Sequence, residues 1–115
     1  MSIKISAFSK RPGQKPRHVW VSNNLEALQK NVEGYIETVT IRDPEDEAYN
    51  LVVICNEEGL LKGMEPNVSV YGVRFYGPIL VVGVKDGGDN GDEFADLPYT
   101  WGELKDLYPE LWEDL

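Results

Sequence analysis

Cysteine and histidine are nearly absent from this sequence, which contains one residue of each type, Cys55 and His18. A single cysteine cannot form an internal disulfide, and Cys55 lies in an apolar run where a small thiol packs well, so we expect it to be buried and structural. A serine or cysteine triad needs a nucleophile, a base and an orienting group, and no nucleophile is placed for His18. We therefore expect His18 at a strand edge, and we predict no catalytic residue and no enzymatic activity.

Long hydrophobic runs are also missing. The two longest, residues 51–55 and 79–84, are far shorter than the roughly 20 apolar residues that span a bilayer. The first residues alternate polar and apolar types and lack the continuous apolar stretch and cleavage site of a secretory signal. We therefore expect no membrane segment and a cytoplasmic location.

Positive charge is scarce, because 20 Asp and Glu residues oppose 11 Lys and Arg residues and leave a net charge of -9. The imbalance lies after residue 42: residues 1–42 carry about +4 and the remainder about -13. Basic residues gather around Pro12 and Gly13, and acidic residues crowd the stretch 86–96; folding could pair the two patches or leave both exposed. A net negative field disfavours direct binding to nucleic acid and permits basic protein partners.

The size of the chain, 115 residues with 42% hydrophobic and 27% charged, is typical of one globular domain. We predict a single α+β domain over residues 1–115, with a flexible Gly/Asp loop at 86–93. That loop fits a calcium site poorly, because aligning Gly91 with the EF-hand glycine puts Gly88 and Leu97 at ligand positions. We expect no metal and no cofactor.

Apolar and polar residues alternate in two N-terminal stretches, around 3–7 and 18–22, and predict a β-hairpin with its turn at 11–14. Asn23, with Glu26 three residues later, is interpreted as the N-cap of a short helix that Gly34 ends. The helix carries its apolar residues at spacings of three and four, so we expect it to lie on a sheet.

The middle of the chain predicts the other strands of the sheet, at 35–41, 49–55, 68–76 with a bend at Gly72, and 79–84. A turn with Gly59 in the left-handed conformation is expected to return the chain on a strand through Leu60 and Leu61. Runs 49–55 and 79–84 are continuously apolar, so we predict that they are neighbours in the sheet interior, covered on both faces.

Near the C-terminus, Thr100 and Glu103 predict the capped start of a short second helix before Pro109. The expected fold class is therefore α+β, with a mixed, mostly antiparallel sheet of five to six strands, a short helix after the N-terminal hairpin and a short C-terminal helix. Two alternatives stay open: residues 110–115 either dock on the domain or await a partner, and the tryptophans belong either to the core or to a contact surface. The tryptophans are Trp20, Trp101 and Trp112; Trp20 is the most suggestive, on the polar face of its strand.

Four segments, residues 24–29, 32–37, 55–63 and 77–83, carry a resemblance to a known family. Their signatures are Gly34-Tyr35-Ile36-Glu37 and Cys55-Asn56-Glu57-Glu58-Gly59, which occur in order. Over about residues 19–100 the chain resembles an uncharacterised small-domain family carried by bacteriophages and mobile elements of Firmicutes and related bacteria. The resemblance implies a mobile-element accessory protein in a bacterial host, and it supplies no reaction, ligand or catalytic residue.

Our first functional hypothesis is a non-enzymatic accessory protein that binds a host protein and inhibits a host defence system through an acidic surface. The residues predicted to bind this partner are Asp86, Asp89, Asp92, Glu93, Asp96, Glu113 and Asp114. The alternative hypothesis is a binder that sequesters an anionic nucleotide signal, at a site formed between subunits of a homo-oligomer. Its predicted ligand-binding residues are Arg42, Arg74, Tyr35 and Tyr76, together with the basic hairpin.

Overall fold

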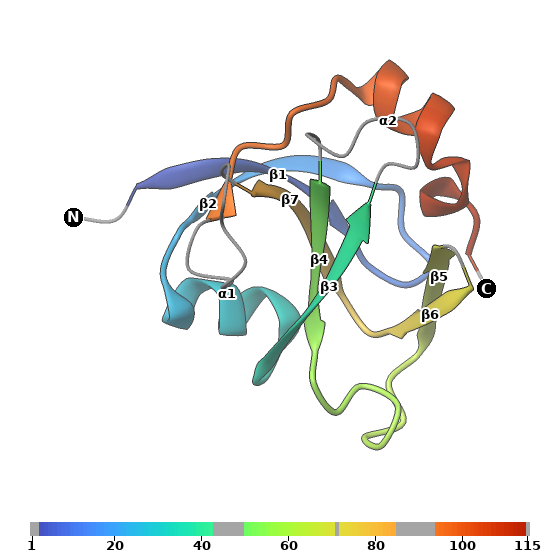
Figure 1. The fold of residues 1–115 in the computed structure, drawn as a ribbon. Coiled ribbons are helices and arrows are strands. Elements are labelled where there is room, and N and C mark those ends of the chain that lie inside the picture. Colours follow the sequence, from blue (N-terminus) through green and yellow to red (C-terminus); the bar gives the residue numbers. More distant parts are fainter. Residues whose placement is uncertain (1–2, 43–49, 71, 85–93, 115) are drawn as a thin grey trace.

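A six-stranded sheet forms the centre of the computed structural model, which describes residues 3–42, 50–70, 72–84 and 94–114 (Figure 1). Its strands are β1 (Lys4–Lys10), β2 (Arg17–Ser22), β3 (Ile36–Arg42), β4 (Asn50–Asn56), β7 (Ile79–Val84) and β8 (Phe94–Ala95). Five of them follow the order β2-β1-β7-β4-β3, and β8 pairs with the C-terminal end of β7. The pairs are antiparallel, so the predicted α+β class is confirmed.

Two apolar strands, β4 and β7, lie side by side in the sheet interior, as predicted, with Val53 opposite Val81. Side chains alternate between the faces of a strand, so Val53 joins one core cluster and its neighbour Val52 joins the other. Both clusters are buried, which explains why these strands are apolar without alternation.

Among the described elements, the helix α1 (Leu25–Val32) covers one face of the sheet. The other face is covered by three kinds of element: the helix α2 (Trp101–Leu107), the short 3-10 helix η1 (Pro109–Trp112), and a separate hairpin of β5 (Pro66–Val70) and β6 (Val73–Tyr76). Figure 1 shows α1 on the opposite side of the sheet from α2 and η1. The fold therefore has three layers, and residues from both ends of the chain meet on the α2 face.

The N-terminal hairpin and the helix after it form as predicted, with a shift of one residue at the start of the helix. Asn24 caps α1, because its side chain accepts a hydrogen bond from the Ala27 N–H at 2.8 Å. Asn23 instead donates its side-chain amide to the Phe94 carbonyl at 3.2 Å. Glu33, not Gly34, takes the left-handed conformation at the end of the helix, with φ 62°, and the Gly34 N–H closes the last turn on the Gln29 carbonyl.

Three predictions for residues 56–76 are wrong. Leu60 and Leu61 lie in a turn rather than on a strand, and they are 66% and 88% exposed. Gly59 is required for a close approach and not for a left-handed turn, since a Cβ there would lie 2.5 Å from the Tyr76 carbonyl oxygen. The run 68–76 is not one bent strand: Gly72, at φ 81°, lies in the turn between β5 and β6.

The C-terminal helix begins with the predicted capping box. Thr100 Oγ1 accepts from the Glu103 N–H at 3.2 Å, and the Glu103 carboxylate accepts from the Thr100 N–H at 3.0 Å. The segment after it docks on the domain, because Leu111 is buried against the core and Asp114 forms a backbone bridge with Val68. We refer to residues 101–114, which comprise α2, η1 and this docked segment, as the C-terminal layer.

The two described α-helices are short, with eight and seven residues. Within the described part of the chain, no helix combines the length and the apolar character that crossing a membrane requires. The predicted loop at 86–93 lies outside the described residues.

Candidate functional site

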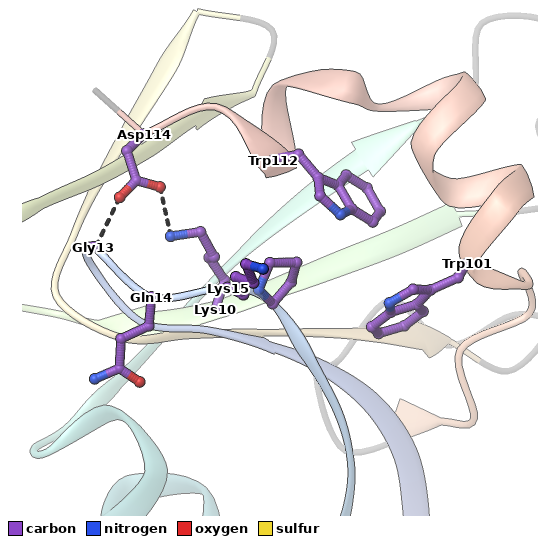
Figure 2. Close-up of a pocket in the computed structure, with 8 residues that line it drawn as sticks. Lys10, Gly13, Gln14, Lys15, Trp101, Trp112 and Asp114 are labelled. Atoms are coloured by element: carbon purple, nitrogen blue, oxygen red, sulfur yellow. Dashed lines mark hydrogen bonds and ion pairs between the residues drawn. The ribbon is translucent and has the colours of Figure 1, made fainter.

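A cavity of about 460 Å³ opens between the turn of the N-terminal hairpin and the C-terminal layer (Figure 2). We call it the hairpin cavity. The residues that line it are Lys10, Gly13, Gln14, Lys15, Pro16, Trp101, Trp112 and Asp114. Because the antiparallel hairpin ends at the edge where the C-terminal layer covers β1, residues about 100 positions apart share one concave surface.

Lys10 is the last residue of β1, and its side chain is only 1% exposed. It points to the same face as Phe8, toward the C-terminal layer, because the two residues are separated by two positions on a strand. Its Nζ lies 2.6 Å from Asp114 Oδ1 and donates a hydrogen bond to the Arg11 carbonyl at 2.8 Å. A buried ammonium group needs such partners, since its loss of hydration is otherwise uncompensated.

Asp114 has both carboxylate oxygens engaged, because Oδ2 accepts a hydrogen bond from the Gly13 N–H at 2.7 Å. Gly13 has φ 71°, a left-handed conformation in the hairpin turn. The hydrogen bond from Lys10 lowers the pKa of Asp114, the Gly13 N–H and the charge of Lys10 lower it further, and burial acts in the opposite direction. Asp114 therefore stays ionised and ties the hairpin turn to the C-terminal layer.

Two indole rings form the other wall of the cavity. Trp101 and Trp112 are half-buried, and their ring centroids are 6.2 Å apart with an angle of 85° between the planes. Both rings also pack on Phe8, with centroid distances of 5.1 Å and 5.3 Å. Figure 2 shows Asp114 at one end of the cavity, the indoles at the other, and Lys10 and Lys15 between them. The two tryptophans thus have core contacts on one side and cavity contacts on the other.

The two positive charges of the hairpin turn differ in whether they form an ion pair. Arg11 forms an ion pair with Glu33, with its two guanidinium nitrogens 3.0 Å and 3.1 Å from one carboxylate oxygen. Lys15 is exposed in the hairpin cavity, and within the described residues no carboxylate pairs with it. The cavity therefore combines aromatic surface with an ammonium group that is available to an anion.

A second, smaller cavity of about 200 Å³ lies between β6 and the edge of the sheet formed by β3 and β4. Arg74 and Tyr76 line it, together with Glu37 and Cys55. The Cys55 thiol donates to the Glu37 carbonyl at 3.5 Å, and burial, followed by the negative charge of Glu37, raises its pKa to about 11. Cys55 is thus buried, as predicted, and a thiol that stays protonated at neutral pH is a poor nucleophile.

Four of the residues predicted to bind a partner, Asp86, Asp89, Asp92 and Glu93, lie outside the described residues. Of the other three, Asp96 accepts a hydrogen bond from the Ser6 N–H at 2.7 Å, and Asp114 is bound to Lys10. Glu113 is exposed at the end of η1. Two of the three described acids are therefore engaged in contacts within the fold.

The residues of the alternative ligand site are not brought together as one set. Arg74 and Tyr76 share the second cavity, whereas Tyr35 is 68% exposed and lines neither cavity. Arg42 ends β3 opposite Asn50, and its side chain lies outside what the structure describes.

His18 has a close hydroxyl neighbour, so the expectation that no nucleophile lies near it is wrong. Ser6 Oγ lies 2.6 Å from His18 Nε2. The antiparallel register of β1 and β2 makes these two residues diagonal neighbours on the same face of the sheet. The ring of His18 also meets Trp20 and Trp101 edge to face, at 5.3 Å and 6.2 Å between centroids. Within the described residues, no carboxylate is hydrogen-bonded to the other ring nitrogen, so the orienting member of a triad is lacking there. The described residues also contain no group of three or more His, Cys, Asp or Glu side chains that could hold a metal ion.

The hairpin cavity was not predicted from the sequence, although one signal for it is present there. Lys10 stands two positions after the apolar Phe8 on the same strand, so strand alternation alone places a charge on a buried face. Nothing local indicates its partner Asp114 or the indoles, because those residues come from the other end of the chain.

The model of a protein family described as "Domain of unknown function (DUF3846)" matches residues 4–107. The match contains the central sheet, α1 and α2, and with them Lys10, Lys15 and Trp101 of the hairpin cavity. Trp112 and Asp114 lie beyond the matched residues. No curated protein and no solved structure matches the chain.

Proposed function

Since the chain belongs to the DUF3846 family of domains of unknown function, we propose a function from its geometry: a non-enzymatic protein whose hairpin cavity binds a small anionic ligand with an aromatic ring, such as a nucleotide. This proposal keeps the ligand class of the alternative hypothesis, an anionic nucleotide. It places the binding site in the hairpin cavity rather than at Arg42, Arg74, Tyr35 and Tyr76.

The observation that carries the proposal is the presence of two indoles and two lysines in one cavity. The volume, about 460 Å³, falls in the range of roughly 300–1,000 Å³ that is usual for small-molecule sites. Stacking on an aromatic side chain contributes about 1–3 kcal/mol per base, and the perpendicular indoles offer a face and an edge to one planar ring. Lys15 would then pair with a phosphate group of the ligand.

A binding function without catalysis is supported by what surrounds the cavity. The nearby Ser6–His18 pair has no orienting carboxylate among the described residues. The cavity itself contains two lysines and one aspartate, and Asp114 is held in its ionised form, so it is a poor general acid.

Thermal denaturation with AMP, GMP, CMP and UMP, and with the four uncharged nucleosides, tests the proposal. A ligand that binds only the folded state raises the melting temperature progressively with concentration. We expect at least one nucleotide to do so, and its nucleoside to have a smaller effect because it lacks the group that pairs with Lys15. Equal melting temperatures with every compound would overturn the proposal.

Two tryptophan variants locate the binding site. Trp112→Leu removes a cavity indole, whereas Trp20→Leu removes a ring that is 61% exposed and lies outside the cavity. We expect Trp112→Leu to weaken nucleotide binding roughly ten-fold in calorimetric titrations and Trp20→Leu to leave it unchanged. Trp112→Phe keeps an aromatic ring against Phe8 and controls for a loss of folding.

A second candidate function is the one that the resemblance to phage and mobile-element proteins favours: binding of a basic host protein, with inhibition of a host defence system. The C-terminal layer supports it, because its exposed charged residues are mostly acidic. These acids are Glu103, Asp106, Glu113 and Asp114, with Lys105 as the one exposed cation among residues 101–114. Carboxylates arranged on such a surface can occupy sites that otherwise bind phosphates.

Capture of a host protein on immobilised protein at increasing salt tests this second function. We expect captured protein to be released by salt and lost with the double variant Asp106→Asn/Glu113→Gln. The double variant Glu26→Gln/Glu57→Gln changes the net charge equally at exposed positions outside the C-terminal layer, and it should retain the partner. Equal capture by both variants would contradict an acidic binding surface in this layer.

A further inference from the structure

Asp114 lies where an external anion would be expected to bind. One of its carboxylate oxygens contacts the Lys10 ammonium at 2.6 Å, and the other accepts from the Gly13 N–H at 2.7 Å (Figure 2). An ammonium group together with a backbone N–H in a turn is a common way for proteins to bind phosphate and carboxylate groups.

The three members of this contact differ in accessibility. Lys10 is 1% exposed and donates a hydrogen bond to the Arg11 carbonyl, whereas the side chain of Asp114 is 38% exposed. The cation is therefore a buried part of the fold, whereas solvent can reach both Gly13 in the hairpin turn and the carboxylate of Asp114. An anion that entered from the cavity would replace Asp114 without first unburying Lys10.

The contact also belongs to the same cavity as the two indoles. A ligand whose ring rests on Trp101 or Trp112 would have its charged group directed toward Lys15 and Lys10, which lie between the indoles and Asp114 (Figure 2). A phosphate is a better partner than a carboxylate for two ammonium groups, because it carries more negative charge and more acceptor oxygens.

We infer that Lys10 and the Gly13 N–H form an anion subsite, that Asp114 fills it as an internal competitor, and that a phosphate group of the ligand displaces Asp114. This inference rests on the proposed function and specifies the ligand as one with a phosphate group. Displacement removes the tie between the hairpin turn and the C-terminal layer, so binding also releases the segment that pairs with Val68. The lowered pKa of Asp114 agrees with a subsite that selects a negative charge.

The test is a titration of inorganic pyrophosphate, followed through the Gly13 amide signal in ¹H–¹⁵N spectra. Asp114→Asn removes the competing charge and leaves a side chain of the same size. Glu113→Gln changes the net charge equally at the neighbouring position, which makes no ion pair with Lys10. We expect Asp114→Asn to bind pyrophosphate roughly ten-fold more tightly than the wild type, and Glu113→Gln to match the wild type within about two-fold. Equal affinities for the two variants would overturn the inference.

The wild-type protein provides a second measurement that does not depend on how well Asp114→Asn folds. At saturating pyrophosphate, the backbone amides of Glu113 and Asp114 should gain rapid motion in ¹⁵N relaxation data, because their contact with the hairpin is lost. Pyrophosphate that shifts the Gly13 signal while Asp114 keeps its rigidity would also count against displacement.

The outcomes separate this inference from the proposed function. If nucleotides bind and lose affinity with Trp112→Leu, but Asp114→Asn and Glu113→Gln behave alike, the proposed function stands and the inference fails. If pyrophosphate prefers Asp114→Asn but no nucleotide binds any variant, the anion subsite stands and the proposed ligand class is wrong.

Discussion

At the scale of single residues, the most consequential contact is the one between Lys10 and Asp114. Lys10 is 1% exposed, so its ammonium group has lost its hydration and contacts one carboxylate and one carbonyl instead. Removing the partner of a buried charge costs more than the pair contributes, because the remaining charge keeps its loss of hydration. The contact is therefore important for stability as well as for the proposed binding.

We expect Asp114→Asn to lower the free energy of unfolding by about 1–2 kcal/mol. This loss is small for a buried charge that loses its partner, because the carboxylate of Asp114 is partly exposed. Urea denaturation followed by fluorescence measures the change, with Glu113→Gln as a control that should remain within about 0.5 kcal/mol of the wild type. An Asp114→Asn variant as stable as the control would mean that Lys10 finds another partner.

The pH dependence of the same pair follows from the sign of the pKa shift. The pKa of Asp114 is lowered in the folded state from its ordinary value of 3.8, chiefly by the hydrogen bond from Lys10. Its contribution is therefore fully present above the ordinary value and is lost as the pH falls through the lowered one. We expect the stability difference between wild type and Asp114→Asn to be constant from about pH 7 to 5 and to shrink below pH 3.8. A difference that grows on acidification would contradict the direction of the shift.

At the scale of elements, local sequence patterns predicted most strands and helices correctly but not the residues at which they end. The capping box of Thr100 and Glu103 and the alternation of β1 and β2 depend on near neighbours, and both formed as predicted. The end of α1 did not: Glu33 takes the left-handed conformation that Gly34 was expected to supply. Asn56, which donates to the carbonyls of Val32 and Glu33, fixes the chain there, and this contact cannot be read from the helix alone.

Glu33 provides a test of this helix end. A residue with a Cβ is disfavoured in the left-handed conformation by about 1–2 kcal/mol relative to glycine. Glu33→Gly and Glu33→Ala both lose the ion pair with Arg11, so their difference isolates the backbone term. We expect Glu33→Gly to be more stable than Glu33→Ala by about 1 kcal/mol in thermal denaturation. The reverse order would show that the helix ends at another residue.

At the scale of the whole molecule, the N-terminal and C-terminal parts have opposite charge and meet in the hairpin cavity. Lys10 and Gly13 from the basic part hold Asp114 from the acidic part. Arg11, by contrast, pairs with Glu33 within the first 42 residues. Among the described residues, Lys10–Asp114 is the ion pair that joins the two charged parts, and the exposed acids of the C-terminal layer other than Asp114 form no ion pair there.

Leu111 tests whether the C-terminal layer is part of the folded core, although it lies beyond the residues that the family model matches. It is 1% exposed and packs in the cluster that contains Phe8 and Val68. We expect Leu111→Ala to destabilise the protein by about 2–5 kcal/mol in urea denaturation. Leu61→Ala, at a position that is 88% exposed, should change stability by less than about 0.5 kcal/mol. A small effect of Leu111→Ala would mean that the layer detaches without loss of the fold.

The sequence by itself determined the α+β class, the N-terminal hairpin, the adjacent interior strands and the capped C-terminal helix. These features depend on periodicity and on contacts between near neighbours, which the order of residues contains directly. Only the tertiary structure decided that Leu60 and Leu61 lie in a turn, that Gly72 separates two strands, and that Lys10 and Asp114 meet. The Gly13–Asp114 contact joins residues 101 positions apart, and no local pattern encodes such a pairing. The hairpin cavity is therefore a property of the folded chain, because burial of Lys10 and the position of its partner both arise only when the C-terminal layer closes over β1.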